Sequence, residues 1–310
     1  MELIVSVAPH QRSKISIHWA MRQVIIALIP AILASLILFR EKALFLILNC
    51  SLSCLLTEEI ILKIKRKPSQ AKNCSAILTG ILLALVLPPS TKWYAATLGS
   101  IFAIFIGKQV FGGLGQNIFN PALIGRAFLA AAYPKMMTTW INPFTLDAIT
   151  RATPLALRKF DQILTPLKDL FIGTVPGSLG ETSALALIIG GIYLLIRKVI
   201  DWRIPLTLLV TTVIISSIFY FLEPLNGSPL FHIFSGGFLL GAFFMATDPV
   251  TTPVTKKGRY IFGVGCGILI MVIRYFSGLP EGVMYSIIFM NALVPLINRY
   301  TIPKPFGYER

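Results

Sequence analysis

The residues best suited to chemistry lie in one polar segment, DAITRATPLALRKF, at positions 147–160. It contains an aspartate, Asp147, followed at fixed spacing by two threonines, Thr150 and Thr153. Another enzyme can modify a threonine hydroxyl only if it can reach it, which requires an exposed, non-helical backbone. Pro154 follows Thr153 directly, and a proline disfavours the helical conformation in the residue before it. The spacing therefore predicts a hydroxyl that is presented for covalent modification.

The order of Asp147, Thr150, Ala152 and Thr153 matches the pattern Asp-x-x-[Ser/Thr]-x-Ala-Thr. This pattern occurs in membrane subunits that carry FMN in a phosphoester on the last threonine. The small Ala152 leaves room for a transferase and a bulky flavin. Many instances have glycine at the position of Arg151, although a guanidinium can also pair with a phosphate. The alternative is an ordinary polar loop in which Asp, Thr and Pro form turns.

The composition is that of a membrane protein. Of the 310 residues, 55% are hydrophobic and 13% are charged, whereas soluble domains carry about 25% charged residues. The formal net charge of +15 indicates cytoplasmic loops beside an anionic membrane surface. It does not indicate nucleic-acid binding, because the chain has no soluble basic domain. The mixed polarity of the first residues excludes a cleavable signal.

Ten apolar runs are long enough, or nearly long enough, to span a bilayer. They lie at about 23–39, 43–62, 75–88, 93–110, 120–133, 183–199, 204–222, 229–247, 259–276 and 282–299. The third and fifth are shorter than the ~20 residues of a full crossing. Short spans bounded by Gly and Pro indicate broken helices at a site within the membrane. The expected fold is an all-α polytopic membrane protein with about ten transmembrane helices.

The distribution of lysine and arginine predicts the orientation. With the N-terminus inside, the cytoplasmic segments hold 18 of these residues and the short external loops hold 3. The long polar segment after the fifth span is then external. The chain divides into a cytoplasmic tail at 1–22, a five-span repeat at 23–133, an extracytoplasmic loop at 134–181, a second five-span repeat at 182–299 and a cytoplasmic tail at 300–310.

The two five-span parts resemble each other weakly. In TGILLALVLPP, Gly80 lies eight residues before Pro88, and in LGAFFMATDP, Gly241 lies eight residues before Pro249. Downstream, FGGLGQNIFNPALIGR is echoed by FSGLPEGVMYSIIFMNALVPLINR. Because five is odd, the halves must have opposite orientations, which predicts an inverted repeat with a site at the midplane. The alternative is a chance likeness from shared Gly, Pro and Leu content.

A second polar cluster, GSLGETSALALIIGG, opens the sixth apolar run. Ser178 and Glu181 have capping-box spacing, and free N–H groups at a helix start can bind an anion or a flavin. Asp248, after the eighth run, is either a helix cap or a flavin or ion contact. The candidate flavin contacts are Asn120, Arg151, Ser178, Gly180, Glu181, Thr182, Ser183 and Asp248.

Two carboxylates, Glu58 and Glu59, fall inside the second apolar run. Carboxylates within a membrane are costly, so a functional role is expected, here ion coupling. The alternative is that both side chains extend toward Lys63 and Lys65 at the cytoplasmic end of the run.

Other polar residues in the apolar runs have structural explanations. Cys50 and Cys54 are one helical turn apart, but small buried residues of a helix account for them better than ligands do. No metal site is therefore expected. Arg126 and Arg274 lie near span ends, where interfaces neutralise them.

The chain resembles the D subunit of Rnf ion-translocating oxidoreductase complexes in four segments that follow one another over nearly its whole length: GQNIFNPALIGRAFL, DAITRATPLA, GSLGETSALALIIGG and ATDPVTTPVTKKGRYIFGVGCG. A relative of that protein is the B subunit of the sodium-pumping NADH:quinone reductase. The resemblance implies a fold like that of urea transporters, FMN bound covalently to Thr153, and a second, non-covalent flavin, riboflavin or FMN. It also implies partners, namely the other membrane and peripheral subunits and a flavin transferase.

The expected function is that of a flavin-carrying subunit in the cell (inner) membrane, which couples ferredoxin and NAD redox chemistry to Na⁺ or H⁺ transport. It is not expected to be catalytic alone, because the chain has no nucleotide-binding motif and no cluster-binding cysteine set. One alternative is a secondary transporter or solute channel of the same fold without a redox role. Another is a purely structural membrane anchor, and fold analogy cannot separate the three.

Overall fold

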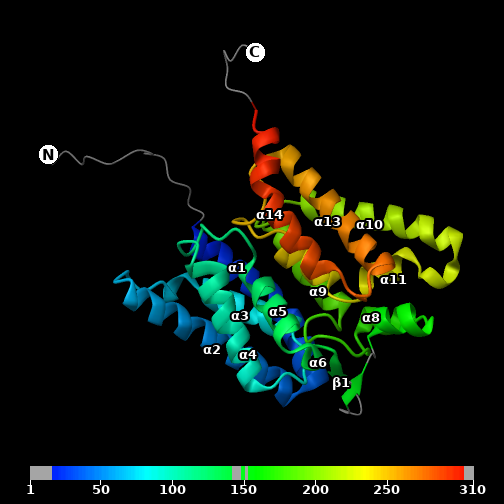
Figure 1. The fold of residues 1–310 in the computed structure, drawn as a ribbon, viewed down its shortest axis with the longest axis horizontal. Coiled ribbons are helices and arrows are strands. Elements are labelled where there is room, and N and C mark those ends of the chain that lie inside the picture. Colours follow the sequence, from blue (N-terminus) through cyan, green and yellow to red (C-terminus); the bar gives the residue numbers. More distant parts are fainter. Residues whose placement is uncertain (1–15, 142–147, 151–152, 304–310) are drawn as a thin grey trace.

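The computed structural model describes residues 16–141, 148–150 and 153–303, which are mostly helical (Figure 1). All ten apolar runs are helical. In the first half the helices are α1 (Ile17–Phe39), α2 (Glu41–Ile64), α3 (Ser75–Val86), α4 (Trp93–Ile104) with the π-helical η2 (Phe105–Gln109), and α5 (Pro121–Ala132). In the second half they are α9 (Ala184–Ile196), α10 (Arg203–Leu222), α11 (Pro229–Phe234), α12 (Phe238–Leu240) with η5 (Gly241–Met245), α13 (Lys256–Phe276) and α14 (Val283–Thr301).

The chain is a polytopic membrane protein by the length and composition of its helices. Among the described residues, α1, α2, α10 and α13 are long and apolar enough to cross a membrane. The pair Pro224–Phe234 and Phe238–Met245, bent by 43°, is a fifth span if it is counted as one broken helix. The crossing of the membrane by all ten runs stays a prediction.

Three apolar helices, α3, α5 and α9, have only 12 or 13 residues, fewer than the ~20 of a full crossing. The end of α3 is completed from outside the helix. The backbone N–H groups of Leu179 and Gly180 donate to the carbonyls of Leu87 and Leu85, at 3.1 and 2.7 Å. Gly180 is required there, because a Cβ at this position would lie 2.8 Å from the Leu85 Cβ. The segment before α9 thus supplies donors to carbonyls that a helix end leaves free.

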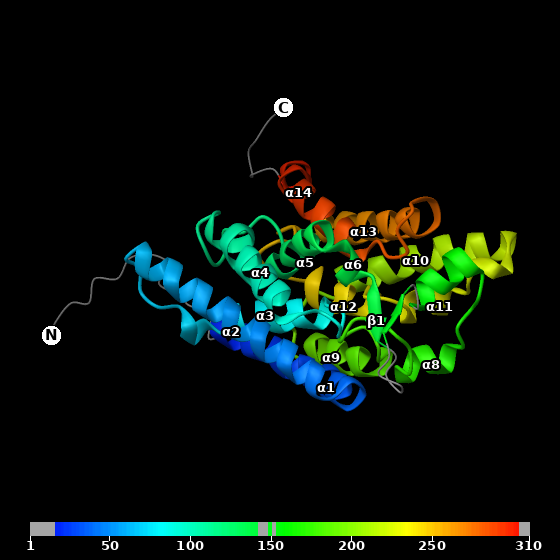
Figure 2. The ribbon, with the colours of Figure 1, turned by 60° about the horizontal axis from the view of Figure 1, so that its bottom comes forward.

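The helices of the two halves pack in a corresponding order. In the first half α2 packs on α4 and α4 on α5, and in the second half α10 packs on α13 and α13 on α14. The halves meet where α1 lies along α9 and where α5 contacts α14 (Figure 2). At this second contact, the amide oxygen of Asn291, in the orientation that satisfies its neighbours, accepts from the Asn120 backbone N–H at 3.2 Å.

The connecting segment between the halves is not purely helical. It contains α6 (Pro134–Met137), α7 (Pro154–Ala156), the π-helical η3 (Leu157–Asp161) and α8 (Leu167–Ile172). It also contains two short strands, β1 (Thr139–Ile141) and β2 (Ala148–Thr150), which pair antiparallel with Thr139 opposite Thr150. The all-α expectation is therefore wrong for this segment, because two extended stretches flank residues 142–147 and satisfy each other's backbone groups.

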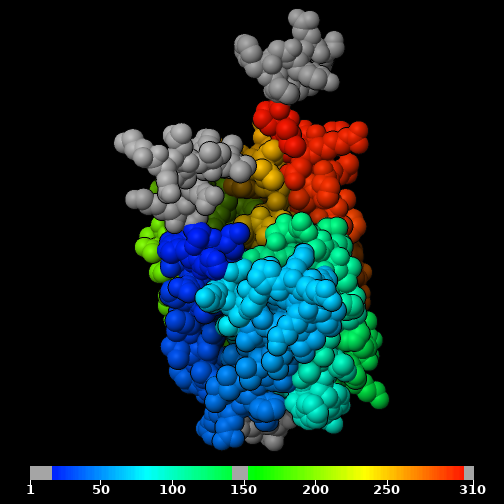
Figure 3. All heavy atoms as spheres, turned by 90° about the vertical axis from the view of Figure 1, so that its left-hand side faces the viewer, coloured from blue at the N-terminus to red at the C-terminus, as the bar shows by residue number. Residues whose placement is uncertain are grey.

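The connecting segment and the chain ends lie at opposite ends of the molecule. Figure 1 shows the end of α14 at the top and the start of α1 in the upper half, while β1 is at the bottom. Figure 3 shows the first (blue) and last (red) described residues at the same end. The segment is fixed to the second half by Lys159, whose ammonium donates to the Arg274 and Leu279 carbonyls at 2.9 Å each.

Candidate functional site

Thr153 has the backbone conformation that the sequence predicts. Its φ of −70° and ψ of 145° are extended, and it is the N-cap of α7, with Pro154 at the first helical position. Its Oγ1 accepts a hydrogen bond from the Ala156 N–H at 3.3 Å. The side chain is half-buried, while Pro154 and Ala156 are buried. The non-helical conformation is thus confirmed, although Thr153 is less exposed than expected.

The remainder of the threonine motif is only partly described. Asp147, Arg151 and Ala152 lie outside the described residues. Thr150 ends β2, where its backbone pairs with Thr139. Recognition roles for Asp147 and Thr150, and phosphate pairing by Arg151, stay predictions.

A cavity of about 550 Å³ lies beside Thr153, and we call it the loop-side cavity. This volume is within the range of ~300–1,000 Å³ that ligand pockets occupy. Its walls come from both halves and from the connecting segment: Pro88, Arg126, Ala130, Pro134, Met137, Thr138, Trp140, Thr153, Ala156, Phe160, Gly278, Leu279, Pro280, Glu281, Met284 and Tyr285. Most of these side chains are apolar, and three are aromatic. Thr153 therefore borders a space of ligand size.

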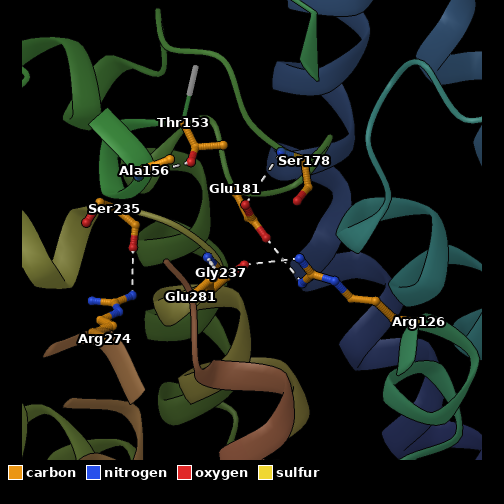
Figure 4. Close-up of polar contacts among 9 residues, drawn as sticks. All are labelled: Arg126, Thr153, Ala156, Ser178, Glu181, Ser235, Gly237, Arg274 and Glu281. Carbon is orange, nitrogen blue, oxygen red and sulfur yellow. Dashed lines mark hydrogen bonds and ion pairs between the residues drawn. The ribbon is translucent and has the colours of Figure 1, made fainter. Parts of the chain in front are cut away.

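A charged cluster lies at the wall of this cavity (Figure 4). The Arg126 guanidinium, from α5, donates to the Glu281 carboxylate at 3.0 Å and to the Glu181 carboxylate at 3.4 Å. The second oxygen of Glu281 accepts from the Gly237 N–H, and that of Glu181 accepts from the Ser178 N–H at 3.5 Å. The cluster connects the first half to the second, because Arg126 precedes the connecting segment and Glu281 directly precedes α14.

Glu181 titrates in an unusual range for a carboxyl group. Burial raises the pKa of Glu181 to about 7, and the neighbouring Glu281 carboxylate adds to the rise. The Arg126 guanidinium opposes it, as do the side chain and the backbone N–H of Ser178. Glu181 therefore binds its proton nearer to neutral pH than an ordinary glutamate does.

The predicted capping box is wrong, because Ser178 does not cap a helix. Helix α9 begins at Ala184, and its N-cap is Ser183, whose hydroxyl accepts from the Ala186 N–H. Residues 179–182 form a turn and a bend instead of a first helical turn, and the Gly180 N–H in this turn donates to the Leu85 carbonyl. Only the reciprocal half of the box remains, in which the Glu181 carboxylate accepts from the Ser178 N–H.

The structure brings only part of the second polar cluster to Thr153. Glu181 and Thr182 line a small hollow of about 40 Å³ that also borders Thr153. Gly180 and Ser183 are buried and have structural roles, as a close contact and a helix cap. Arg126 and Glu281 were missed as site residues; the only signal for them was a charge near a span end.

Asn120 and Asp248 lie at a different place. They line a cavity of about 80 Å³ together with Lys108 and the start of α1, and we call it the termini-side cavity. The Asn120 side chain caps α5 by accepting from the Ala122 N–H at 3.0 Å. Asp248 accepts from the Val250 N–H at 3.2 Å, and burial raises its pKa. Neither residue lines the loop-side cavity.

Glu58 is paired with a residue that the sequence did not suggest. Its carboxylate lies 2.6 Å from the Lys108 ammonium, and the two side chains are 1% and 2% exposed. Lys108 also donates to the Ser75 hydroxyl at 2.7 Å. Extension of Glu58 toward Lys63 or Lys65 is therefore wrong.

Glu59 accepts from the Ser69 hydroxyl at 2.9 Å. Ion coupling by Glu58 and Glu59 stays a prediction. Among the residues that the structure describes, no group of three or more His, Cys, Asp or Glu is arranged to hold a metal ion. Cys50 and Cys54 are buried thiols. Arg274 is buried and donates to the His232 and Ser235 carbonyls, which agrees with neutralisation at an interface.

Comparison with known proteins gives matches over the whole length. The model of the NQR2, RnfD, RnfE family matches residues 4–307. The D subunit of the Na(+)-translocating ferredoxin:NAD(+) oxidoreductase complex of Acetobacterium woodii is 45% identical over 314 residues, covering 100% of this chain and 97% of that protein. The D subunit of the proton-translocating complex of Clostridium ljungdahlii is 43% identical, covering 99% and 96%. The D subunit of an ion-translocating oxidoreductase complex of Escherichia coli is 35% identical, covering 99% of each.

Proposed function

The chain belongs to the NQR2, RnfD, RnfE family, and from this premise we propose that it is the D subunit of an ion-translocating ferredoxin:NAD⁺ oxidoreductase complex. The names of its full-length relatives support this assignment. It acts as a member of a membrane complex, because its sequence lacks the motifs that bind a nicotinamide nucleotide or an iron–sulfur cluster. Electrons therefore reach it through partner subunits.

Within this complex Thr153 carries FMN through a phosphoester on its hydroxyl. The observation that carries this proposal is the position of Thr153: its extended backbone places Oγ1 at the border of the loop-side cavity. FMN supplies the redox chemistry when bound, and the protein supplies position and electrostatics. The chain's own contribution is an apolar wall with Trp140 and Tyr285, and Arg126 as the cation among the described lining residues.

The residues around Thr153 fit an esterified hydroxyl. The existing hydrogen bond from the Ala156 N–H uses a lone pair of Oγ1 and not its hydrogen. Esterification replaces that hydrogen and keeps the oxygen in place, so it leaves the cap of α7 available. Attachment requires a separate flavin transferase that can reach the segment.

A second, non-covalent flavin has weaker support. Asn120 and Asp248 share the termini-side cavity, but its volume of about 80 Å³ is below the ~300 Å³ of ordinary ligand pockets. A flavin there requires the lining side chains to move. Of the other candidate contacts, Glu181 and Thr182 are the two that border the same hollow as Thr153.

The proposed topology has ten spans in two inverted five-span repeats, with both termini cytoplasmic and the connecting segment outside. The corresponding packing order of the halves and the contact between Asn120 and Asn291 support the repeat. The location of both chain ends opposite β1 supports an even number of crossings (Figure 1). A reporter that is active only outside the cell should therefore work near Phe160, and one that is active only inside should work at Arg310.

The test of flavin attachment uses the chain made together with its flavin transferase. A denaturing gel should show flavin fluorescence under ultraviolet light, and Thr153→Ala should abolish it. Thr150→Ala is the matched control, because it removes a hydroxyl of the same motif. It should lower the yield but leave the flavin on Thr153. Mass spectrometry of the peptide decides the site. An unmodified Thr153, or flavin on Thr150, would contradict the proposal and favour a transporter without a redox role.

A further inference from the structure

The charged cluster beside the loop-side cavity is not electrically balanced. Glu181 and Glu281 are two carboxylates that share one guanidinium, that of Arg126. Arg274 is the other cation whose charge acts on both carboxylates, but its guanidinium donates to the His232 and Ser235 carbonyls. With both carboxylates ionised, the cluster is one cation short. In a buried place such an excess charge is costly unless a proton or an ion neutralises it.

The two carboxylates differ in the lengths of their hydrogen bonds. Glu281 accepts from Arg126 at 3.0 Å and from the Gly237 N–H. Glu181 has only the long contacts to Arg126 at 3.4 Å and to the Ser178 N–H at 3.5 Å, although its side chain is 5% exposed. A buried ionised carboxylate is stable only with several good partners. Glu181 therefore has unused capacity to accept a cation.

The side chain of Ser178 provides an independent observation. Its hydroxyl is fully buried and has no hydrogen-bond partner among the described residues. Figure 4 shows this hydroxyl directed toward the space between the Glu181 carboxylate and the Arg126 guanidinium. Buried hydroxyl groups nearly always have a partner, and oxygen atoms of this kind are ligands of hard cations.

We propose that Glu181, Glu281 and the Ser178 hydroxyl form a binding site for one monovalent cation, a proton or a sodium ion, with Arg126 as the fixed counter-charge. Arg126 balances one carboxylate permanently, and the bound cation balances the other. The site is at the wall of the loop-side cavity, because Glu281 and Arg126 line it. The proposal rests on the proposed function only in identifying this cation with one that the complex translocates; binding itself requires no flavin.

The test measures the melting temperature of the purified full-length chain in detergent by tryptophan fluorescence. Sodium chloride replaces choline chloride at constant ionic strength, at about pH 8.5, where an ordinary carboxyl group is ionised. If sodium is the ligand, the melting temperature should rise by several degrees with sodium concentration, because a ligand that binds only the folded state stabilises it. Glu181→Gln and Glu281→Gln should each abolish this rise.

If a proton is the ligand, sodium should have no effect and pH should have a large one. The pKa of Glu181 is raised in the folded chain to about 7, above the ~4.3 of an unfolded glutamate. The stabilisation is therefore present at low pH and is lost as pH rises through about 7. Glu181→Gln should flatten this dependence, since a glutamine cannot titrate.

Two variants keep the test decisive. Ser178→Ala removes only a hydroxyl, so the fold should persist while sodium binding weakens by about threefold to tenfold, the effect of one modest ligand contact. Glu41→Gln, at the exposed start of α2, is the matched control and should respond like the native chain. The proposal is overturned if the native chain responds to neither cation, or if the response persists in Glu181→Gln. Flavin fluorescence of the same samples on a denaturing gel tests the proposed function separately.

Discussion

The termini-side cavity and the loop-side cavity are bordered by buried charges that are arranged in opposite ways. At the termini-side cavity, Lys108 faces Glu58 one to one at 2.6 Å, and both side chains are at most 2% exposed. At the loop-side cavity, Arg126 is shared by Glu181 and Glu281, and the three side chains are 14%, 5% and 18% exposed. The first is a neutral pair that is almost fully buried, and we call it the closed pair. The second, which we call the open cluster, is more exposed and carries excess negative charge.

The difference follows from which parts of the chain each group joins. Lys108 belongs to η2 and Glu58 to α2, so their pair holds two elements of the first half together. Arg126 and Glu281 come from different halves, and Glu181 from the segment between them. A neutral pair within one half is suited to stability, while an unbalanced cluster between halves is suited to exchange with a ligand. Burial alone therefore does not identify a functional charged group. The net charge of the group and its access to a cavity identify it better.

The largest expected effect comes from breaking the closed pair. Lys108→Met leaves Glu58 buried without its counter-charge, which should lower the free energy of unfolding by about 3–5 kcal/mol. Thermal denaturation of the purified chain in detergent measures this. The double variant Lys108→Met with Glu58→Gln should recover most of the loss, because a neutral amide can stay buried. Equal stability of the single and double variants would show that Lys108 is not the counter-charge that Glu58 requires.

A smaller and pH-dependent effect is expected from the open cluster. Arg126→Met should cost about 1–3 kcal/mol at alkaline pH, since Glu181 and Glu281 then repel each other without a cation between them. Below neutral pH the cost should shrink, because carboxyl groups at a cavity can take up protons. Denaturation of native and variant chains across this pH range checks the prediction. A loss of stability that does not change with pH would show that the carboxyl groups of the cluster do not take up protons.

The smallest effect separates the two serines near Glu181. Ser183→Ala removes the N-cap of α9 and should cost about 1 kcal/mol. Ser178→Ala should be nearly neutral for stability, since the hydroxyl that it removes has no hydrogen-bond partner among the described residues. Parallel denaturation curves distinguish the two. A larger cost for Ser178→Ala would restore the capping role predicted from the sequence and would count against a cation site there.

The sequence predicts those structural features that depend on residues close together along the chain. Each apolar run contains helical residues, and Pro154 predicts the extended backbone of Thr153. The serine that caps α9 is missed because Ser178 has the right spacing, whereas residues 179–182 form a turn whose backbone contacts Leu85 and Leu87, far away in the chain. The partner of Glu58 is missed for the same reason: Lys63 and Lys65 are close in sequence, but Lys108 is close in space. The cluster at Arg126 depends on residues from three parts of the chain.

Lys159 has a consequence for motion between the halves. Its ammonium binds carbonyl oxygens at the end of α13 and before α14, so the connecting segment is fastened to the second half at a point six residues from Thr153. On the other side of Thr153, β2 pairs with β1, and the Thr139 carbonyl of β1 accepts from the Ser90 hydroxyl of the first half at 2.5 Å. Thr153 is thus held between an anchor on each half. If the halves rock against each other, Thr153 follows the boundary between them and not either half alone.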